Sequence, residues 1–394
     1  MIRKKKRNAL LALLLAVLLM TLSVPVFATE AEIDTISQSA DLSLTFPCKS
    51  ALLMEASTGK ILFEQNADEA LPPASVTKVM TLLLVMEAIA DGRLHYEDTV
   101  TASAHACSMG GSQIYLKEGE QMSVEDMLKS VVIASANDAA LALAEHIAGT
   151  EEAFVEQMNR RAAELGMENT HFENTNGLDD TTTAHLTSAR DIAIMSRALL
   201  AHPKITEYSS IWMDTIRDGQ FGLTNTNRLV RFYRGATGLK TGSTARAGFC
   251  ISATATRDGL DLICVIMGAE SRDIRNSTAA SLLDWGFSNY EVYSAPTLEL
   301  EPIRVLGGVQ AACGVRTECF SDVMPKNDAK RVQYVTELPK SLSAPVRKGD
   351  VVGKIIYQLD GKTIGEVSIV ADESVEKISF GEILLRILSR MALA

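Results

Sequence analysis

Hydrophobic and polar positions follow two different periods along the body of the chain. Apolar residues recur every three to four positions in several segments, which predicts helices over 75–89, 124–133, 136–148, 151–165, 188–201 and 277–285. Shorter apolar runs bounded by turn residues predict strands over 51–56, 61–64, 239–242, 249–256 and 261–267. The order of strands, helices and strands predicts one α/β domain over residues 46–294, with an antiparallel sheet, helices and an inserted helical lobe.

After Ala295-Pro296 the pattern changes to short runs rich in Val, Ile and Leu that alternate with Gly, Pro and Asp. These runs predict strands over 301–306, 331–336, 351–359 and 362–370. Asp360-Gly361 separates the last two runs and is typical of a two-residue hairpin turn. We therefore expect a small all-β domain over residues 297–375.

The two ends of the chain have the patterns of targeting and membrane segments. Basic residues Arg3 to Arg7, an apolar run from Ala9 to Val24 and small residues up to Ala28 predict a signal peptide over 1–28, followed by a linker over 29–45. The alternative is an uncleaved signal anchor, although the apolar run is short for a membrane span. In either case we expect the body of the protein to lie outside the cytoplasm.

The last segment, residues 376–394, predicts an amphipathic helix. On a helical wheel its polar residues share one narrow arc, and apolar residues fill the rest: the polar ones are Ser379, Glu382, Arg386, Ser389 and Arg390. A segment this short, with charges near its middle, is better suited to lie in a membrane surface than to cross a bilayer. The alternative is a terminal helix packed on the preceding domain.

Composition and charge exclude several classes of protein. The chain has 394 residues, of which 47% are hydrophobic and 22% charged, so disorder is excluded as its main state. A formal net charge of −11 without a basic stripe makes nucleic acid an improbable partner. Among the six cysteines, the predicted hairpin places Cys250 opposite Met267 and Cys264 opposite Ala253, so the two thiols point to opposite sheet faces. Cys313 and Cys319 are close enough to bridge across a turn.

Three short motifs carry candidate chemistry. Ser75 and Lys78 form an S-x-x-K pair on one helix face, where a buried neutral amine could take a proton from the hydroxyl. Ser135 and Asn137 stand at a break between two predicted helices and could project together into a cleft. Lys240-Thr241-Gly242 on a predicted strand offers a cation and a hydroxyl for an anionic group, and its glycine admits a substrate backbone closely.

Each motif alone has an ordinary structural explanation. Lys78 could be an exposed lysine one turn after a capping serine, and Ser135 and Asn137 could cap a helix. In the order S-x-x-K, S-x-N and K-T-G, each on the expected type of element, the three together are a specific signal. Zinc-hydrolase, P-loop and His-based serine-triad motifs do not occur in the sequence.

This motif set resembles that of the penicillin-recognising serine enzymes. The chain is most similar to the low-molecular-mass penicillin-binding proteins, which are serine D-alanyl-D-alanine carboxypeptidases of the S11 peptidase type. The resemblance covers roughly residues 51–290, and the β domain and amphipathic tail also match the family's layout. It is carried by the segments Pro73–Thr81, Ser135–Ala140, Phe154-Val155, Met158-Asn159, Leu165–Met167, Thr187–Asp191 and Thr237–Gly242.

The resemblance implies roles for individual residues. Ser75 would attack the carbonyl of the penultimate D-Ala, with Lys78 as base and Ser135 as proton relay to the leaving D-Ala. Asn137 would hold a substrate amide, and the backbone N–H groups of Ser75 and Ser243 would form the oxyanion hole. The remaining expected substrate-binding residues are Lys240, Thr241, Gly242 and Arg275; for Arg275, which would meet the terminal carboxylate, the alternative is a solvated surface arginine.

The resemblance also implies partners and location. We expect peptidoglycan stem peptides as substrates, β-lactams as covalent inhibitors and no cofactor or metal, at the outer face of a bacterial cytoplasmic membrane. A β-lactamase is the first alternative, but no E-x-x-L-N occurs between Asn137 and Lys240, and Ala136 replaces the Asp of the class A pattern. A non-enzymatic peptidoglycan-binding scaffold is the second. Transpeptidation by the same acyl-enzyme stays open.

Overall fold

The computed structural model describes residues 44–392 of the chain. The predicted signal peptide at 1–28 and almost all of the predicted linker at 29–45 lie outside the described residues. Within the described part, no helix is both long and apolar enough to cross a membrane.

A five-stranded antiparallel sheet forms the centre of the α/β domain, as predicted. Its strand order is β2-β1-β9-β8-β7, so β7 forms one edge. The five strands are β1 (Ser50–Glu55), β2 (Ile61–Gln65), β7 (Ala236–Thr244), β8 (Gly248–Arg257) and β9 (Leu260–Ala269). The predicted hairpin β8-β9 is confirmed, and the two predicted strands β1 and β2 also pair as a hairpin.

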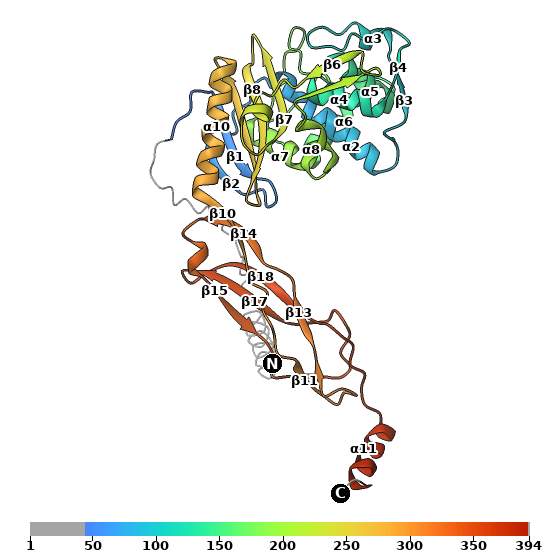
Figure 1. Ribbon diagram of the computed structural model, residues 1–394, viewed down its shortest axis with the longest axis vertical. Helices are drawn as coiled ribbons and strands as arrows, with labels where there is room; N and C mark the ends of the chain where they lie inside the picture. The colour runs from blue at the N-terminus through green and yellow to red at the C-terminus, as the bar shows by residue number, and fades with distance from the viewer. Residues whose placement is uncertain (1–43, 393–394) are drawn as a thin grey trace, which may run out of the picture. The chain divides into compact units, whose positions relative to one another are not determined.

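Both faces of this sheet are covered, and the sequence of the central strand β9 shows why. Ile263, Val265 and Met267 point into the cluster that includes the helical lobe. The alternate residues Leu262, Cys264 and Ile266 point into the cluster on the other face, which α10 (Arg272–Asn289) covers (Figure 1). Because successive side chains of a strand alternate between faces, a nearly continuous apolar run fits a strand that is buried on both sides.

The helical lobe follows the predicted three-to-four periodicity. Its longer helices are α2 (Lys78–Ala90), α4 (Val124–Ile133), α5 (Asn137–Ala148), α6 (Glu151–Glu164) and α7 (Ala189–Leu200). Side chains of Ser123, Thr150 and Ser188 accept hydrogen bonds from the first turns of α4, α6 and α7, and Ser271 does the same for α10. These caps satisfy backbone N–H groups that a helix leaves unpaired at its start.

Several elements differ from the prediction. The helix predicted over 75–89 is a short 3-10 helix, η1 (Ala74–Thr77), followed by α2. Shorter helices and two small hairpins had no periodic signal: α3 (Ala104–Cys107), α8 (Lys204–Ser209), α9 (Leu229–Phe232), β3 (Thr99–Thr101), β4 (Gln121–Ser123), β5 (Met213–Ile216) and β6 (Phe221–Thr224). Such three- to six-residue elements are too short for a period to be read from sequence.

The C-terminal region consists of short strands, as expected. One sheet has the order β13-β18-β17-β15, with β13 (Val315–Thr317), β18 (Lys362–Ala371), β17 (Val351–Leu359) and β15 (Val332–Glu337). A second sheet joins β12 (Ala312–Cys313), β11 (Ile303–Leu306) and β16 (Ser341–Ser343). The strands β10 (Tyr290–Ser294) and β14 (Ser321–Pro325) pair with each other, and η2 (Ala329–Arg331) precedes β15. The predicted hairpin at Asp360-Gly361 joins β17 to β18.

The final helix α11 (Phe380–Ala392) begins later than the predicted residue 376. Before it, Glu376 and Ile378 exchange backbone hydrogen bonds with Val309 and Gly307, and this pairing keeps that stretch extended. Apolar side chains of α11 are exposed, among them Phe380 at 80%, Leu385 at 68% and Leu388 at 53%.

All six cysteines are free. The expected bridge between Cys313 and Cys319 is wrong, because Cys313 is buried while Cys319 is exposed. The expectation for the hairpin is confirmed in part: Cys264 lies opposite Ala253, but a bulge between Phe249 and Ile251 removes Cys250 from its predicted partner. The two thiols still point to opposite faces, Cys250 into the lobe side and Cys264 into the α10 side.

We predict that the denatured protein, unfolded without reductant, takes up six alkyl groups from iodoacetamide, as counted by mass spectrometry. In the native protein Cys319 should react first, because it is exposed, whereas burial raises the pKa of Cys250 to about 11. A lower count in the denatured protein, restored by prior reduction, would reveal a disulfide and contradict this arrangement.

Candidate active site

Ser75 lies in η1, directly before the helix α2 that begins at Lys78. The Lys78 Nζ atom is 2.9 Å from the Ser75 Oγ atom, which is hydrogen-bond distance. Since the two residues are separated by one helical turn, the same local structure brings nucleophile and amine together. The predicted pairing of these two side chains is therefore present.

Lys78 is completely buried. Its Nζ also donates a hydrogen bond to the backbone oxygen of Asn176 at 2.9 Å. Burial holds the pKa of Lys78 well below its ordinary value, and the charge of Lys240 lowers it further, while Asp138 opposes both. No carboxylate of the described residues lies within ion-pair distance of the amine. Lys78 is thus suited to be an uncharged base, and the alternative of an exposed lysine is wrong.

Ser135 and Asn137 lie between α4 and α5 and also face this site. Ser135 adopts a left-handed backbone conformation with φ +64°, and its Oγ accepts a 2.8 Å hydrogen bond from the Nζ atom of Lys240. Asn137 donates through Nδ2 to the backbone oxygen of Gly110 at 2.7 Å. Its Oδ1 atom is buried without a partner in the described part of the chain, so it is free to accept a hydrogen bond from a ligand.

Lys240, Thr241 and Gly242 lie on the edge strand β7. Burial, together with the nearby charge of Arg275, lowers the pKa of Lys240 to about 7. Thr241 donates to the Thr226 hydroxyl at 2.8 Å. A Cβ atom at Gly242 would lie 2.8 Å from the Ser75 backbone nitrogen, so only glycine allows β7 to approach η1 this closely.

The two remaining expected residues lie near this group. Ser243 is an exposed residue next to Gly242 on β7. Arg275 lies on α10 and is only 3% exposed, so it is not a solvated surface arginine. It donates to the side chain of Asn276 and to the Cys250 carbonyl oxygen, and burial lowers its pKa to about 10. No carboxylate among the described residues pairs with it.

Sequence reasoning missed a loop over residues 173–185 that covers the nucleophile. Asn176 supplies the carbonyl that binds Lys78, and His185 contacts Thr77 at 2.8 Å. A Cβ atom at Gly177 would lie 1.8 Å from the Ala74 oxygen, so the loop touches η1 there. The polar segment 174–183 shows neither a helical nor a strand period, and the Asn-Gly pair inside it is a turn signal that does not reveal its contact with η1.

A second missed residue is Asp138, which follows the S-x-N motif. Its buried carboxylate accepts hydrogen bonds from the backbone N–H groups of Ile114 and Leu116. The Asn137 backbone N–H also donates to the Ser112 oxygen. These bonds hold the loop 110–116 against the start of α5 and so form one wall beside Asn137.

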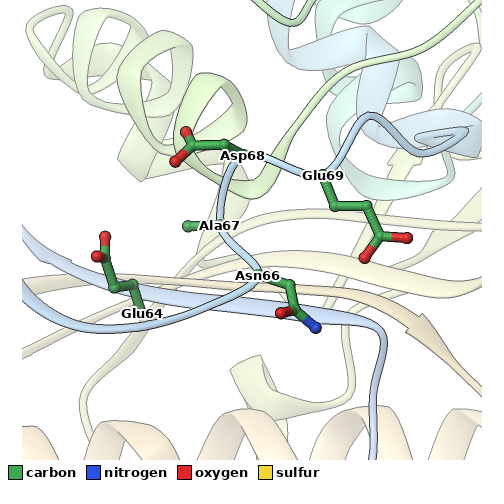
Figure 2. Close-up of a pocket in the computed structure, with 5 residues that line it drawn as sticks. All are labelled: Glu64, Asn66, Ala67, Asp68 and Glu69. Carbon is green, nitrogen blue, oxygen red and sulfur yellow. The ribbon is translucent and has the colours of Figure 1, made fainter.

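A separate surface hollow lies on the loop after β2 and holds none of these residues. Figure 2 shows its lining, which is formed by Glu64, Asn66, Ala67, Asp68 and Glu69. Arg190 pairs with Glu64 at 2.7 Å and with Asp68 at 2.6 Å, so two of the three carboxylates share one arginine as an ion-pair partner. The hollow lacks a nucleophile and is not the candidate site.

The arrangement around Ser75 fits acyl transfer. It combines a hydroxyl nucleophile, an amine that burial keeps uncharged, and a second hydroxyl at Ser135 that a lysine holds in place. Lys240 and Arg275 provide positive charge for an anionic substrate group, and Thr241 adds a hydroxyl that donates to Thr226 in this structure. A serine nucleophile needs an adjacent base of this kind, and here a lysine supplies it instead of a histidine.

Comparisons with known proteins agree with this chemistry. Residues 35–271 match the Peptidase S11 family, described as D-alanyl-D-alanine carboxypeptidase. Residues 298–377 match the family described as penicillin-binding protein 5, C-terminal domain. The two matches follow each other along the chain in the same order as the α/β and β regions.

Individual relatives cover nearly the whole chain. The D-alanyl-D-alanine carboxypeptidase DacF of Bacillus subtilis is 38% identical over 96% of this chain and 97% of its own length. The crystal structure of penicillin-binding protein 5 from Haemophilus influenzae is 33% identical, with a TM-score of 0.71 over 85% of this chain and 99% of that one. Penicillin-binding protein D2 from Listeria monocytogenes, in its ampicillin-bound form, is 31% identical with a TM-score of 0.58 over 62% of this chain and 100% of that one.

We predict that Lys78→Met changes the pH dependence of stability. Between the lowered pKa of folded Lys78 and the ordinary 10.5, the unfolded chain binds the extra proton, so the lysine destabilises the native state increasingly as pH falls, by about 1.4 kcal/mol per unit. The melting temperature of Lys78→Met relative to wild type should therefore be higher at pH 7 than at pH 10.

The control is Lys117→Met, which removes an exposed lysine and should shift the melting temperature equally at both pH values. An equal shift for Lys78→Met at the two pH values would mean that Lys78 is charged in the folded protein and is not the base.

Proposed function

Because the chain belongs to the Peptidase S11 family of D-alanyl-D-alanine carboxypeptidases, we propose that its Ser75 attacks the penultimate D-Ala carbonyl of peptidoglycan stem peptides. The protein is a serine-type hydrolase of the penicillin-binding class. The observation that carries the assignment to Ser75 is its 2.9 Å contact with the buried amine of Lys78. The product is the stem peptide shortened by one D-Ala.

Acylation begins with proton transfer from Ser75 Oγ to the uncharged Lys78 amine. The Oγ atom bonds to the carbonyl carbon, and the bond from that carbon to the terminal D-Ala nitrogen breaks. Ser135 gives its proton to the leaving amine and takes the proton held by Lys78, so that the lysine is uncharged again; the 2.8 Å link of Ser135 to Lys240 supports this role. Water then attacks the ester carbon as Lys78 takes its proton, the bond to Ser75 Oγ breaks, and Lys78 returns the proton to the serine.

The substrate is proposed to lie along β7 as an additional strand. This edge position leaves backbone groups of β7 free to pair with an extended peptide. The unpaired Oδ1 atom of Asn137 would accept a substrate N–H on the opposite side. Lys240, Thr241 and Arg275 would bind the terminal carboxylate, and an arriving anion favours the charged form of Lys240, whose pKa is about 7 without it.

The oxyanion hole is proposed to consist of the backbone N–H groups of Ser75 and Ser243. Gly242 supports this proposal because its lack of a Cβ brings β7 directly against the Ser75 nitrogen. Two N–H groups fixed by a helix and a strand need no rearrangement as charge develops on the carbonyl oxygen. One such donor is commonly worth about 3 kcal/mol of barrier.

Family membership supports the carboxypeptidase over the β-lactamase and the binding scaffold. A β-lactamase must hydrolyse its penicilloyl ester quickly, and the chain lacks the class A glutamate motif. We therefore propose that β-lactams acylate Ser75 and remain attached. The ampicillin-bound form of the Listeria monocytogenes relative supports β-lactam binding by this chain.

We predict that Ser75→Ala lowers the rate of D-Ala release from a peptide ending in Lys-D-Ala-D-Ala by at least about a thousandfold. It should also lose the mass adduct that wild type forms with penicillin, because the atom that forms the bond is gone. Enzymatic detection of D-Ala and intact-protein mass spectrometry measure the two effects.

Ser281→Ala removes an exposed serine on α10 and should keep both activities. An adduct on Ser75→Ala would place the nucleophile elsewhere. Penicillin hydrolysis by wild type at many turnovers per second, without a lasting adduct, would favour the β-lactamase.

We further propose that the protein is exported and held at the outer face of the cytoplasmic membrane by α11. The first part rests on the signal-peptide pattern at 1–28, and the second on the apolar side chains of α11, which the rest of the described chain does not cover. The charged residues Glu382 and Arg386 lie within the otherwise largely apolar helix α11. This pattern suits a position in the interface between lipid headgroups and acyl chains. Residues 46–294 would then form the catalytic domain and 297–375 a β-rich domain before the anchor.

We predict that the mature chain beginning at residue 29 sediments with vesicles containing anionic lipids and that removal of residues 379–394 abolishes this binding. This cut leaves the pairing of Glu376 and Ile378 with the β domain intact, so the domain should stay folded. Leu385→Glu with Leu388→Glu in the full chain should also abolish sedimentation, because both residues are exposed apolar positions of α11. Binding that survives the truncation would exclude α11 as the anchor.

A further inference from the structure

The contacts behind the nucleophile form a short relay that the catalytic steps do not use. We propose that His185 is a positioning residue for acyl transfer: it holds the Thr77 hydroxyl, Thr77 holds the Ala74 carbonyl, and that carbonyl sets the direction of the Ser75 N–H. The inference rests on the proposed function, because it concerns the Ser75 N–H as a donor to the oxyanion.

The hydrogen bonds fix the tautomer of His185. The backbone N–H of Glu173 donates to the His185 Nδ1 atom at 3.0 Å, so Nδ1 carries no proton. The Thr77 hydroxyl donates to the Ala74 oxygen at 2.8 Å, which uses its single proton. The 2.8 Å contact between His185 Nε2 and Thr77 Oγ1 must then be donated by the imidazole N–H. Every atom of the relay has one defined role.

The surroundings of His185 keep this tautomer in place. The ring is only 2% exposed, and burial lowers its pKa to about 4. The charged or titratable groups that act on it are Glu173, His171, Asp179 and Arg246, and burial outweighs the two carboxylates among them. His185 is therefore neutral at ordinary pH, and a second proton on Nδ1 would oppose the Glu173 N–H.

Ala74 is the point at which this relay reaches the site. It has φ +50°, a conformation that non-glycine residues rarely adopt and that needs support from its surroundings. Thr77 holds its carbonyl oxygen, and the backbone of Gly177 closes over the same group. The carbonyl of Ala74 and the N–H of Ser75 belong to one planar peptide and point in opposite directions. Fixing the first therefore aims the second into the site.

Two substitutions separate the two ends of the imidazole. In His185→Gln the amide nitrogen can reach the position of Nε2 and donate to Thr77, but the contact with Glu173 is lost. In His185→Asn the amide oxygen can replace Nδ1 and accept from Glu173, but nothing reaches Thr77. The control is His171→Gln, an exposed histidine near the same loop that takes no part in the relay.

The experiment measures KM and kcat for a peptide ending in Lys-D-Ala-D-Ala, with kcat divided by the fraction of protein that forms the penicillin adduct. It also measures the rate constant of acylation by penicillin. His185→Asn should lower kcat and the acylation rate about tenfold, the cost of one buried hydrogen bond, with KM changed less than about twofold. His185→Gln should keep both rates within about threefold while it lowers the melting temperature. Thr77→Val should reproduce His185→Asn, and Thr77→Ser should restore the rate.

Equal rates per active molecule for His185→Asn and His185→Gln would overturn the inference, because a histidine that only stabilises the fold would change the melting temperature and the active fraction alone. A fall confined to KM would overturn it as well. Failure of the proposed function is distinct from both outcomes: wild type itself would then form no adduct at Ser75 and release no D-Ala.

Discussion

The structure depends on keeping the amine of Lys78 buried and uncharged beside a hydroxyl. An ammonium ion in this position would need a carboxylate or water, and the described surroundings provide a serine hydroxyl and a carbonyl instead. Such a pocket needs walls from several directions, because water entering from any side would restore the charged form. The lobe supplies α2 and α5, the sheet supplies β7, and the loop 173–185 closes the remaining side. The packing of the lobe and the loop 173–185 against β7 is thus needed for the chemistry.

A second buried lysine, Lys240, influences the charge state of the site. Lys240 carries its amine to Ser135, and its positive charge contributes to the lowered pKa of Lys78. Burial lowers the pKa of Lys240 as well, to about 7, and an anion bound beside this amine would favour its charged form. Similar side chains in different environments can in this way serve as base and as anion-binding cation. Arg275 adds charge at the same end of the site, although the chain as a whole has a net charge of −11.

The sequence alone predicts the three motifs of the site but not the contacts that surround them. Ser75 and Lys78 are joined by helical spacing, and the opposite orientation of Cys250 and Cys264 follows from strand alternation, so local geometry predicts both. The roles of Asp138, Asn176 and His185 depend on contacts between segments far apart in the chain, which no periodicity records. The predicted start of α11 was wrong for the same reason, since Glu376 and Ile378 form backbone hydrogen bonds with a segment about 70 residues earlier in the chain. Local rules also failed at Ala74 and Ser135, where tertiary contacts hold left-handed backbone conformations.

The open edge of β7 also bears on the solubility of the protein. An unpaired strand is a template for any extended chain, including a partly unfolded copy of the same protein. Natural sheets usually block such an edge with proline, inward charges or a cover, but those devices along 240–243 would obstruct the proposed substrate path. At the two flanks, the bulge between Ala236 and Gly238 interrupts the ladder and Arg246 adds charge beyond its end. Binding of peptides along β7, as proposed, would therefore use the same open edge that favours self-association.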